Sequence, residues 1–302
     1  MKKFFILILF LAGQVAAVPQ QVADSSYSPL ILHPEYAPGK GPVVFIDEGH
    51  NNFHTRDGRY MPFTRVLEKD GYVVQPCAGE FTGEKLSGIK ILVIANALNT
   101  VNTQGWYLPT PSAFSKEEIA AVREWITGGG SLFLIADHMP FAGAAAELAG
   151  TFGFSFSNGF AFDTLVQGPS YFTLKEGTMN ESIMTRGRDN SESVQSIVTF
   201  TGQAFTIPSK AIPILVFGPH WMSFESDTAW VFNEKTRRIP VSGWCQGAFM
   251  DFGKGRIAVF GEAAMFTAQL AGPNRNPVGM NAAYAGENYK LLLNIIHWLD
   301  GR

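Results

Sequence analysis

A short apolar strand that runs straight into a polar segment constrains the fold of this chain more than any other feature. Residues 43–46 read VVFI, and residues 47–54 then read DEGHNNFH. A continuous apolar run is typical of a strand buried on both faces, as in a parallel sheet. Ligands of open parallel sheets bind just beyond the carboxyl ends of the strands. The pattern therefore predicts an α/β fold with its chemistry after residue 46.

Further apolar runs alternate with segments of helical spacing. Ser115 and Glu118 have the spacing of a capping box at the start of one helix, which three glycines end at 128–130. This alternation is that of βαβ units, so the strands are expected to be parallel. The other predicted strands are 72–74, 91–95, 131–136 and 256–260, and the other predicted helices are 61–69, 141–152, a helix from about 263, and 287–299.

Between about 155 and 250 the pattern changes to short segments rich in Gly, Ser, Thr and Asn. A turn at 253–255 predicts a hairpin with the strand that follows it. We expect a β-rich insertion built onto the sheet rather than a separate domain. Its predicted strands are 196–200, 212–217, 229–232 and 247–252.

The first 17 residues combine a basic start, a short apolar stretch and small residues, which is typical of a secretory signal peptide. Residues 18–40 are rich in proline and are predicted to form an extended arm. Residues 41–302 are predicted to form a single α/β domain that carries the insertion. We expect an exported protein, periplasmic or secreted. No later stretch approaches the ~18 apolar residues of a transmembrane span.

Composition limits the partners. The formal net charge is -3 and charged residues make up 16% of the chain, so no basic face is expected for nucleic acid. Aromatic residues reach 13%, which indicates either a well-filled core or an aromatic-lined pocket for a sugar. The two cysteines, Cys77 and Cys245, either pair or remain buried thiols.

The strongest prediction of a site comes from polar residues at several strand ends. Because the carboxyl ends of parallel strands share one edge, these groups are expected to line a common cleft. The predicted catalytic residues are Asp47, Glu48, Asp137, His138 and Glu262. The predicted substrate-binding residues are Asn51, Asn96, Asn99 and His220.

Histidines and carboxylates are also the ligands of zinc, manganese and iron, so a divalent metal is a candidate cofactor. The predicted ligands are Asp47, His50, His54 and His138. Their spacing matches no fixed zinc motif. The alternative is a hydrogen-bonded polar network in which the histidines are neutral.

Residues 129–137, GGSLFLIAD, resemble the central βα unit of the class I glutamine amidotransferase-like superfamily. The order of elements is similar to the ThuA-like and GldG-like branch: an early strand, a Gly-rich stop before a strand, a late GKGR hairpin and a closing Asn-rich helix. The resemblance covers about 40–155 and 245–300. It implies a flavodoxin-like three-layer sandwich with a mostly parallel sheet.

The resemblance does not imply amidotransferase activity. Glutamine amidotransferases need a cysteine at the turn after the central strand, where this chain has Asp137 and His138. Some members of the branch act on or bind sugars. The predicted function is therefore a hydrolase, with or without a metal, acting on a sugar or another small polar substrate. The alternative is a non-catalytic module that binds a glycan or a protein at the same edge.

Overall fold

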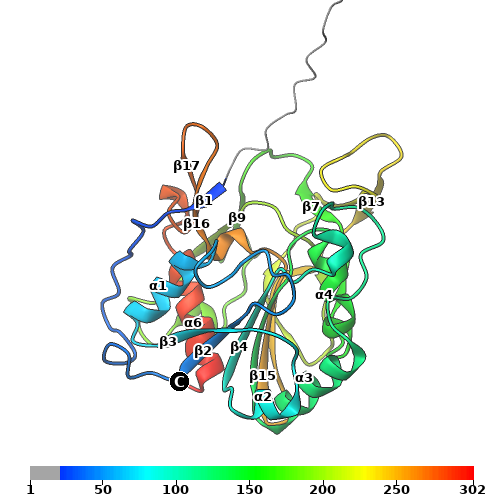
Figure 1. The fold of residues 1–302 in the computed structure, drawn as a ribbon. Coiled ribbons are helices and arrows are strands. Elements are labelled where there is room, and N and C mark those ends of the chain that lie inside the picture. Colours follow the sequence, from blue (N-terminus) through cyan, green and yellow to red (C-terminus); the bar gives the residue numbers. More distant parts are fainter. Residues whose placement is uncertain (1–20) are drawn as a thin grey trace, which may run out of the picture.

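A computed structural model describes residues 21–302 and shows an α/β architecture built on a mixed sheet of nine strands (Figure 1). The predicted signal peptide, 1–17, lies outside the described residues, as do residues 18–20 of the predicted arm. Within 21–302, no helix is both long and apolar enough to cross a membrane.

The parallel half of the sheet confirms the strands predicted from apolar runs. All neighbours in this half run parallel, and β5 pairs residue by residue with β4 on one side and β15 on the other. The strand order is β3 (Val73–Cys77), β2 (Val43–Asp47), β4 (Ile91–Ala95), β5 (Ser131–Ile135) and β15 (Gly255–Phe260).

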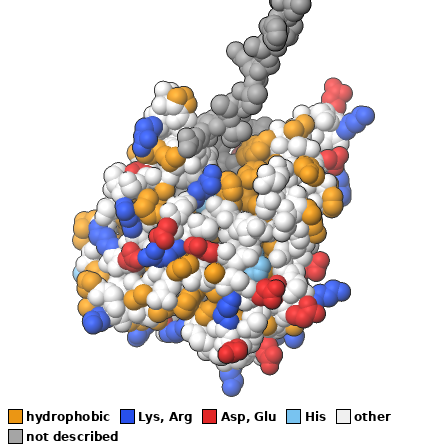
Figure 2. Space-filling model, in the orientation of Figure 1, with side chains coloured by type: hydrophobic (Ala, Val, Ile, Leu, Met, Phe, Trp, Pro, Cys, Tyr) orange, Lys and Arg blue, Asp and Glu red, His pale blue; other side chains and the backbone are white. Residues whose placement is uncertain are grey.

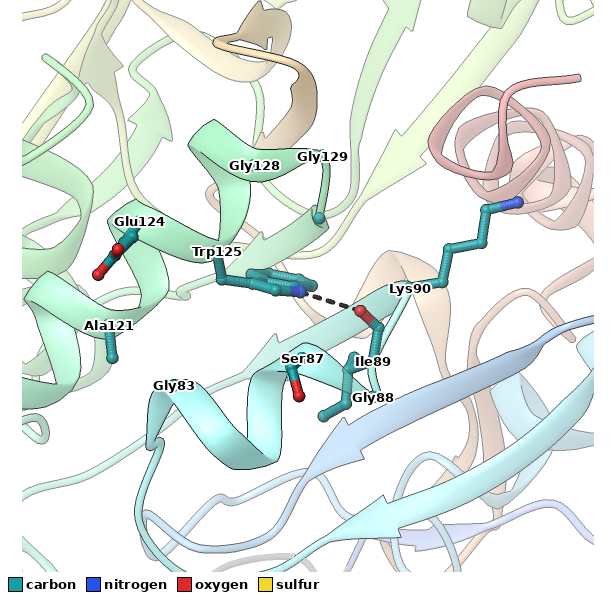
Figure 3. Close-up of a pocket in the computed structure, with 11 residues that line it drawn as sticks. Gly83, Ser87, Gly88, Ile89, Lys90, Ala121, Glu124, Trp125, Gly128 and Gly129 are labelled. Carbon is teal, nitrogen blue, oxygen red and sulfur yellow. Dashed lines mark hydrogen bonds between the residues drawn. The ribbon is translucent and has the colours of Figure 1, made fainter.

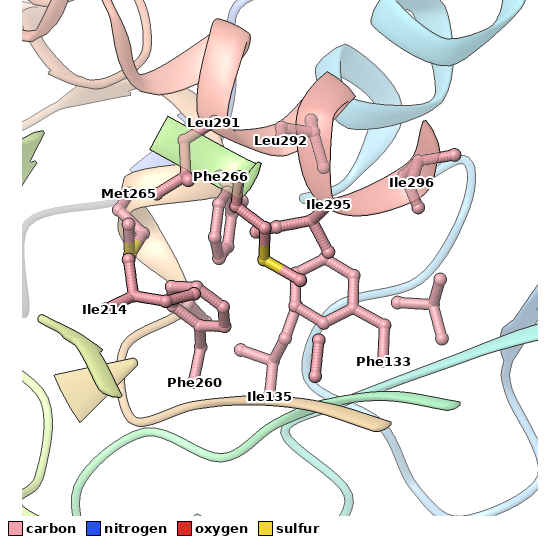
Figure 4. Packing of buried hydrophobic residues seen from close by; sticks show 14 of the residues in the cluster. Phe133, Ile135, Ile214, Phe260, Met265, Phe266, Leu291, Leu292, Ile295 and Ile296 are labelled. Atoms are coloured by element: carbon pink, nitrogen blue, oxygen red, sulfur yellow. The ribbon is translucent and has the colours of Figure 1, made fainter. Parts of the chain in front are cut away.

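Helices cover both faces of this half, which explains why its strands are apolar without alternation. In β5, Phe133 and Ile135 belong to the core with α1 and α6, whereas Leu132 and Leu134 belong to the core with α2, α3 and α4. Figure 4 shows Phe133 and Ile135 packed with Phe260 below the side chains of α6. The helices are α1 (Met61–Lys69), α2 (Gly83–Ser87), α3 (Lys116–Gly128), α4 (Phe141–Gly150) and α6 (Asn288–Asp300).

The predicted capping box at the start of α3 is confirmed. The Ser115 hydroxyl accepts a hydrogen bond from the Glu118 amide at 3.2 Å, and the Glu118 carboxylate accepts one from the Ser115 amide at 2.9 Å. Glu118 is buried, and its second carboxylate oxygen accepts a hydrogen bond from the Phe81 amide at 2.9 Å.

The region around 155–250 extends the sheet with antiparallel strands. A hairpin turn at 253–254 joins β14 (Cys245–Phe252) to β15, and β14 also pairs with β10 (Phe205–Thr206) and β11 (Ile212–Val216). Strand β6 (Ser155–Phe156) completes the sheet beside β10.

Two small sheets cover the carboxyl ends of the parallel strands. One contains β7 (Phe160–Asp163), β12 (Trp221–Glu225) and β13 (Arg237–Pro240), and the other contains β1 (Gln21–Ala23), β16 (Ala268–Ala271) and β17 (Asn276–Gly279). A two-stranded sheet pairs β8 (Ser170–Thr173) with β9 (Ser196–Thr199). The remaining elements are η1 (Thr100–Asn102), α5 (Ile183–Arg186) and η3 (Ala283–Ala285).

Two predicted elements are wrong. Residues 229–232 form no strand but a loop between β12 and β13, where Trp230 and Val231 are more than half exposed. The helix predicted from about residue 263 is a single 3-10 turn, η2 (Ala264–Phe266), because the backbone becomes extended at Thr267 and enters β16.

The two cysteines are buried and unpaired. Cys77 ends β3 and Cys245 begins β14, and β2, β4, β5 and β15 lie between these strands. Burial raises the pKa of the Cys245 thiol to about 12, so it is not an activated nucleophile.

Candidate functional site

The carboxyl ends of β4, β5 and β15 open into a cavity of about 630 Å³. The small sheet of β1, β16 and β17 borders it on one side, and the loop after β12 borders it on another. Figure 2 shows hydrophobic side chains gathered on the upper right of the visible face, where Figure 1 places β7 and β13. The lining residues with polar or titratable side chains near the strand ends are His54, Arg59, Asn96, Asp137, His138, Thr201, Glu262 and Gln269.

Asp137 and Glu262 form the acidic pair of the cavity. They follow the adjacent parallel strands β5 and β15, where Ile135 pairs with Phe260. The Asp137 carboxylate accepts hydrogen bonds from the amides of His138 at 2.8 Å and Ala263 at 3.3 Å. Two strand ends in register therefore hold two carboxyl groups together.

Glu262 is the more deeply buried member of this pair, with 1% of its surface exposed. Its carboxyl accepts hydrogen bonds from the amides of Ala264 at 3.0 Å and Met265 at 2.6 Å, which begin η2. Burial raises the pKa of Glu262 well above its usual range, the charge on Asp137 raises it further, and the amide hydrogen bonds only partly oppose this. Glu262 is the member of the pair that retains its proton.

His138 is oriented by the backbone and by aromatic rings. Its Nδ1 lies 2.7 Å from the Met139 carbonyl, which can only accept, so Nδ1 carries the proton and Nε2 remains an acceptor in the neutral ring. The Nε2 atom lies 3.9 Å from the Asp137 carboxylate. The ring stacks on Phe160 at 4.2 Å and meets the edge of Trp230 at 4.9 Å.

His54 lies deeper and is kept neutral. Burial lowers its pKa to about 3, and the charge of Arg59 lowers it further. Its ring lies 4.7 Å from the ring of Tyr60, and its Nδ1 has no hydrogen-bond partner within residues 21–302. The Arg59 guanidinium lies over the ring of Phe53, 3.8 Å from the centroid.

Two residues at the cavity occupy the left-handed backbone region without being glycine. Asn96, after β4, has φ of +50°, and its side-chain oxygen accepts a hydrogen bond from the Asp137 amide at 2.9 Å. Trp230 has φ of +66°, which is rare for a bulky residue. Strained positions of this kind concentrate at binding and catalytic sites.

Aromatic side chains line much of the remaining wall. Trp106 lies 5.3 Å from Phe53 and 5.0 Å from Phe141, measured between ring centroids. The Trp106 segment is tied to the loop that carries Trp230, because the Trp106 carbonyl accepts a hydrogen bond from the Ala229 amide at 2.8 Å. The wall therefore combines flat apolar surfaces with a few polar groups, as in small-molecule sites.

A second polar cluster, here called the His50 network, lies outside the cavity. The Nδ1 atom of His50 is 2.9 Å from the Asp47 carboxylate, and its Nε2 atom is 2.9 Å from the Glu118 carboxylate. Burial alone would lower the pKa of His50, but hydrogen bonds and charge from Asp47 and Glu118 outweigh it and raise the pKa. The rings of Phe81 and Phe114 flank His50 at 4.6 Å each.

The structure thus divides the predicted site residues. The cavity brings together five of them, and six lie elsewhere. Those in the cavity are His54, Asn96, Asp137, His138 and Glu262. Those outside it are Asp47, Glu48, His50, Asn51, Asn99 and His220.

The residues outside the cavity make local contacts. Glu48 accepts a hydrogen bond from the Arg56 amide at 2.8 Å, and Asn51 donates one to the Leu98 carbonyl at 3.2 Å. Asn99 caps η1. His220 lies beside a separate pocket of about 390 Å³.

The four predicted metal ligands do not converge. His50 and Asp47 lie in the His50 network, whereas His54 and His138 line the cavity. In the part of the chain from 21 to 302, no three His, Cys, Asp or Glu side chains are grouped so as to hold a metal ion.

Sequence reasoning missed Arg59, Trp106 and Trp230 at the cavity. Arg59 lies in the loop between β2 and α1, so its position after the first strand was a usable signal. The two tryptophans lie in segments that only the fold brings together.

A second groove of about 630 Å³ lies at the opposite edge of the sheet, beside the residues that precede β4 and β5 (Figure 3). Trp125 donates a hydrogen bond to the Ile89 carbonyl at 2.9 Å. The Lys90 side chain points away from Trp125 and forms an ion pair with Asp300. Glycines form much of the rest of the wall. Among the described residues that line this groove, Glu124 is the only carboxylate, so the cavity with its two carboxyl groups is the candidate site.

Comparisons with known proteins bear on the fold. No protein-family model matches the chain, and no curated protein sequence matches it. The mmIFT52 N-terminal domain matches with a TM-score of 0.58 at 15% identity, over 85% of this chain and 96% of that domain. Cytoplasmic Protein STM1381 from Salmonella typhimurium LT2 matches with a TM-score of 0.50 at 12% identity, over 85% and 99% of the two chains.

A ThuA-like protein from Bacteroides uniformis ATCC 8492 matches over 90% of this chain and 94% of its own, at 12% identity and a TM-score of 0.47. At this score the ThuA-like assignment stays a prediction. The two higher scores show a shared fold, and a shared fold does not assign an activity.

Proposed function

We propose that the cavity is the active site of a hydrolase that acts on a carbohydrate or a similar small polar substrate. One observation carries the proposal: Asp137 and Glu262 line one cavity from adjacent strand ends, where burial and the charge on Asp137 raise the pKa of Glu262. In such a carboxyl pair, the group with the raised pKa can supply the acid and its neighbour the base at neutral pH.

Each group then has a distinct role. Glu262 keeps its proton and is the acid that protonates the leaving group. Asp137, fixed by the His138 and Ala263 amides, is the base that takes a proton from the attacking water. His138 presents Nε2 near Asp137 and binds a substrate hydroxyl. This assignment needs no metal ion.

The aromatic wall supports the substrate class. Trp106 and Trp230 offer flat apolar faces on which the apolar side of a sugar ring can pack. The predicted ThuA-like branch includes proteins that act on or bind sugars. We also propose that the chain adopts a flavodoxin-like sandwich and that the protein is exported to the periplasm or the medium.

The test is turnover of a panel of chromogenic glycosides and esters by the purified mature protein. Asp137→Asn and Glu262→Gln are expected to lower kcat/KM by about a hundredfold or more with an unchanged circular dichroism spectrum. Glu48→Gln is the matched control, because Glu48 is also a carboxylate after a strand but lies outside the cavity. An equal loss in Glu48→Gln contradicts the assignment.

A non-catalytic glycan-binding module is the second candidate. One observation favours it: both Glu262 oxygens accept amide hydrogen bonds from η2, so Glu262 could serve only as a structural cap. Glycan binding that survives in Asp137→Asn, without turnover by the unmodified protein, would support the module and end the hydrolase proposal.

A further inference from the structure

Arg59 is a cation that lines the cavity, and the described residues offer it no carboxylate partner. Within residues 21–302, its Nε atom is buried and makes no hydrogen bond. Burial lowers the pKa of Arg59, but arginine remains charged in proteins. Leaving a desolvated charge without compensation is costly.

The surroundings of Arg59 offer it only partial compensation. The ring of Phe53 lies under the guanidinium, which leaves the N–H edges available to a ligand. Arg59 is also the only lysine or arginine among the described residues that line the cavity. Five N–H donors in a planar fork match the two oxygens of a carboxylate.

A second polar atom lies close to this cation without a partner. The Nδ1 atom of His54 is buried and makes no hydrogen bond within residues 21–302. The ring of His54 lies 5.5 Å from the ring of Phe53, over which the Arg59 guanidinium lies, and both side chains line the cavity. Neutral His54 can donate or accept, whereas charged Arg59 only donates.

We infer that the cavity takes a carboxylate-bearing sugar, such as a uronic acid, and that Arg59 binds its carboxylate. This rests on the proposed function, since it assigns the substrate class of the same site. The Asp137 carboxyl lines the same cavity. A single carboxylate balances Arg59, whereas the double charge of a phosphate would also face Asp137.

The experiment measures binding by isothermal titration calorimetry in the Glu262→Gln variant, so that turnover does not interfere and the Asp137 carboxyl is retained. The probes are the 4-nitrophenyl glycosides of glucuronic acid, galacturonic acid, glucose and galactose, with glucose 1-phosphate as the phosphate arm. A charge-assisted pair contributes about 1.5–3 kcal/mol, so at least one uronide is expected to bind about 10–100-fold more tightly than its neutral counterpart.

Arg59→Met is expected to remove this preference without weakening the neutral glycosides, and Arg59→Lys is expected to restore part of it. Arg65→Met is the matched control, since Arg65 lies outside the cavity and contacts the Ser25 carbonyl. Equal binding of acidic and neutral glycosides, or an unchanged preference in Arg59→Met, overturns the inference. Tighter binding of glucose 1-phosphate through Arg59 overturns the choice of carboxylate.

The two proposals fail separately. A uronide that binds through Arg59 but is not hydrolysed by the unmodified protein leaves this inference standing and ends the hydrolase proposal. Hydrolysis of neutral glycosides without any preference for the uronides leaves the hydrolase proposal standing and ends this inference.

Discussion

The His50 network and the cavity use the same residue types in opposite ways. Both ring nitrogens of His50 contact a carboxylate, and the Asp47 carboxylate also accepts hydrogen bonds from the Gly49 amide and the Asn52 side chain. In the cavity, the Nδ1 atom of His54 and the Nε atom of Arg59 have no partner within the described residues. Complete pairing stabilises a fold, whereas a buried polar atom without a partner at a cavity wall is available to a ligand.

Electrostatics separates the two regions further. His50 and His54 are four positions apart, yet the pKa of His50 is raised and that of His54 is lowered to about 3. The carboxylates of Asp47 and Glu118 raise the pKa of His50, whereas burial and the charge of Arg59 lower the pKa of His54. The predictions below test whether this contrast separates structural from functional chemistry.

The largest effect on stability is expected from His50→Ala. Removing one partner of a buried ion pair costs about 3–5 kcal/mol, because Asp47 and Glu118 would be left uncompensated. Urea denaturation measures the free energy of unfolding. If this variant does not fold, Asn52→Ala tests the same network, with an expected cost of about 1 kcal/mol. A loss below 1 kcal/mol in His50→Ala would show that the network is not structural.

Opposite pH dependences are expected for the two histidines. His54 takes a proton near pH 6.5 when unfolded but only near pH 3 when folded, so stability falls as the pH falls between these values. At about 1.4 kcal/mol per pKa unit, the full loss is about 5 kcal/mol. The pKa of His50 is raised on folding, so its contribution is complete below its unfolded pKa and is lost as the pH rises through its folded pKa.

Unfolding free energies measured between pH 4 and 9 check both signs. His54→Phe should flatten the acid side of the profile, and His50→Gln should flatten the alkaline side. If His54→Phe flattened the alkaline side and His50→Gln the acid side, the opposite pKa shifts assigned to the two histidines would be wrong.

An intermediate effect is expected from Gly202→Ala, which tests how Glu262 is held. Gly202 has φ of +97°, and an added Cβ would lie 2.3 Å from the Gly261 carbonyl oxygen and 2.8 Å from the Glu262 Cβ. Gly168→Ala is the matched control, because Gly168 also has a positive φ, +108°, but nothing lies within 4 Å of the added Cβ. We expect Gly202→Ala to cost about 1–3 kcal/mol more than Gly168→Ala in urea denaturation. Equal costs would show that Glu262 is not packed as described.

The smallest effect on stability is expected from Trp230→Ala. Trp230 is 51% exposed, so the free energy of unfolding should change by less than about 1 kcal/mol. Binding of a glycoside should weaken by about tenfold, because the ring borders the cavity beside His138. Trp125→Ala, in the groove at the opposite sheet edge, should leave binding unchanged. Similar binding losses in both variants would contradict the choice of cavity.

The apolar runs predicted the parallel strands because a strand buried on both faces leaves a clear sequence pattern. The strand predicted at 229–232 is wrong because Trp230 and its neighbours have strand propensity but pair with no strand within residues 21–302. The residues after 263 are predicted to be helical, but they form only one 3-10 turn. The Glu262 carboxyl accepts hydrogen bonds from the first two amides of this turn, and the chain then enters β16.

The candidate site was predictable only in part. Strand ends predicted one edge of the sheet and five residues of the cavity, including Asp137 and Glu262. The direction of a side chain after a strand has no periodicity, so the contact of His50 with Glu118 of α3 could not be predicted. The neutrality of His54 depends on burial, which only the folded chain creates.

The protonation state of Glu262 tests the acid–base pair most directly. An infrared difference spectrum between the unmodified protein and Glu262→Gln, recorded at neutral pH, isolates the carboxyl group of this residue. If burial and the charge on Asp137 hold its proton, the spectrum shows the band of a protonated carboxylic acid, and Asp137→Asn changes that band. A carboxylate band in its place, unaffected by Asp137→Asn, would contradict the division of the pair into acid and base.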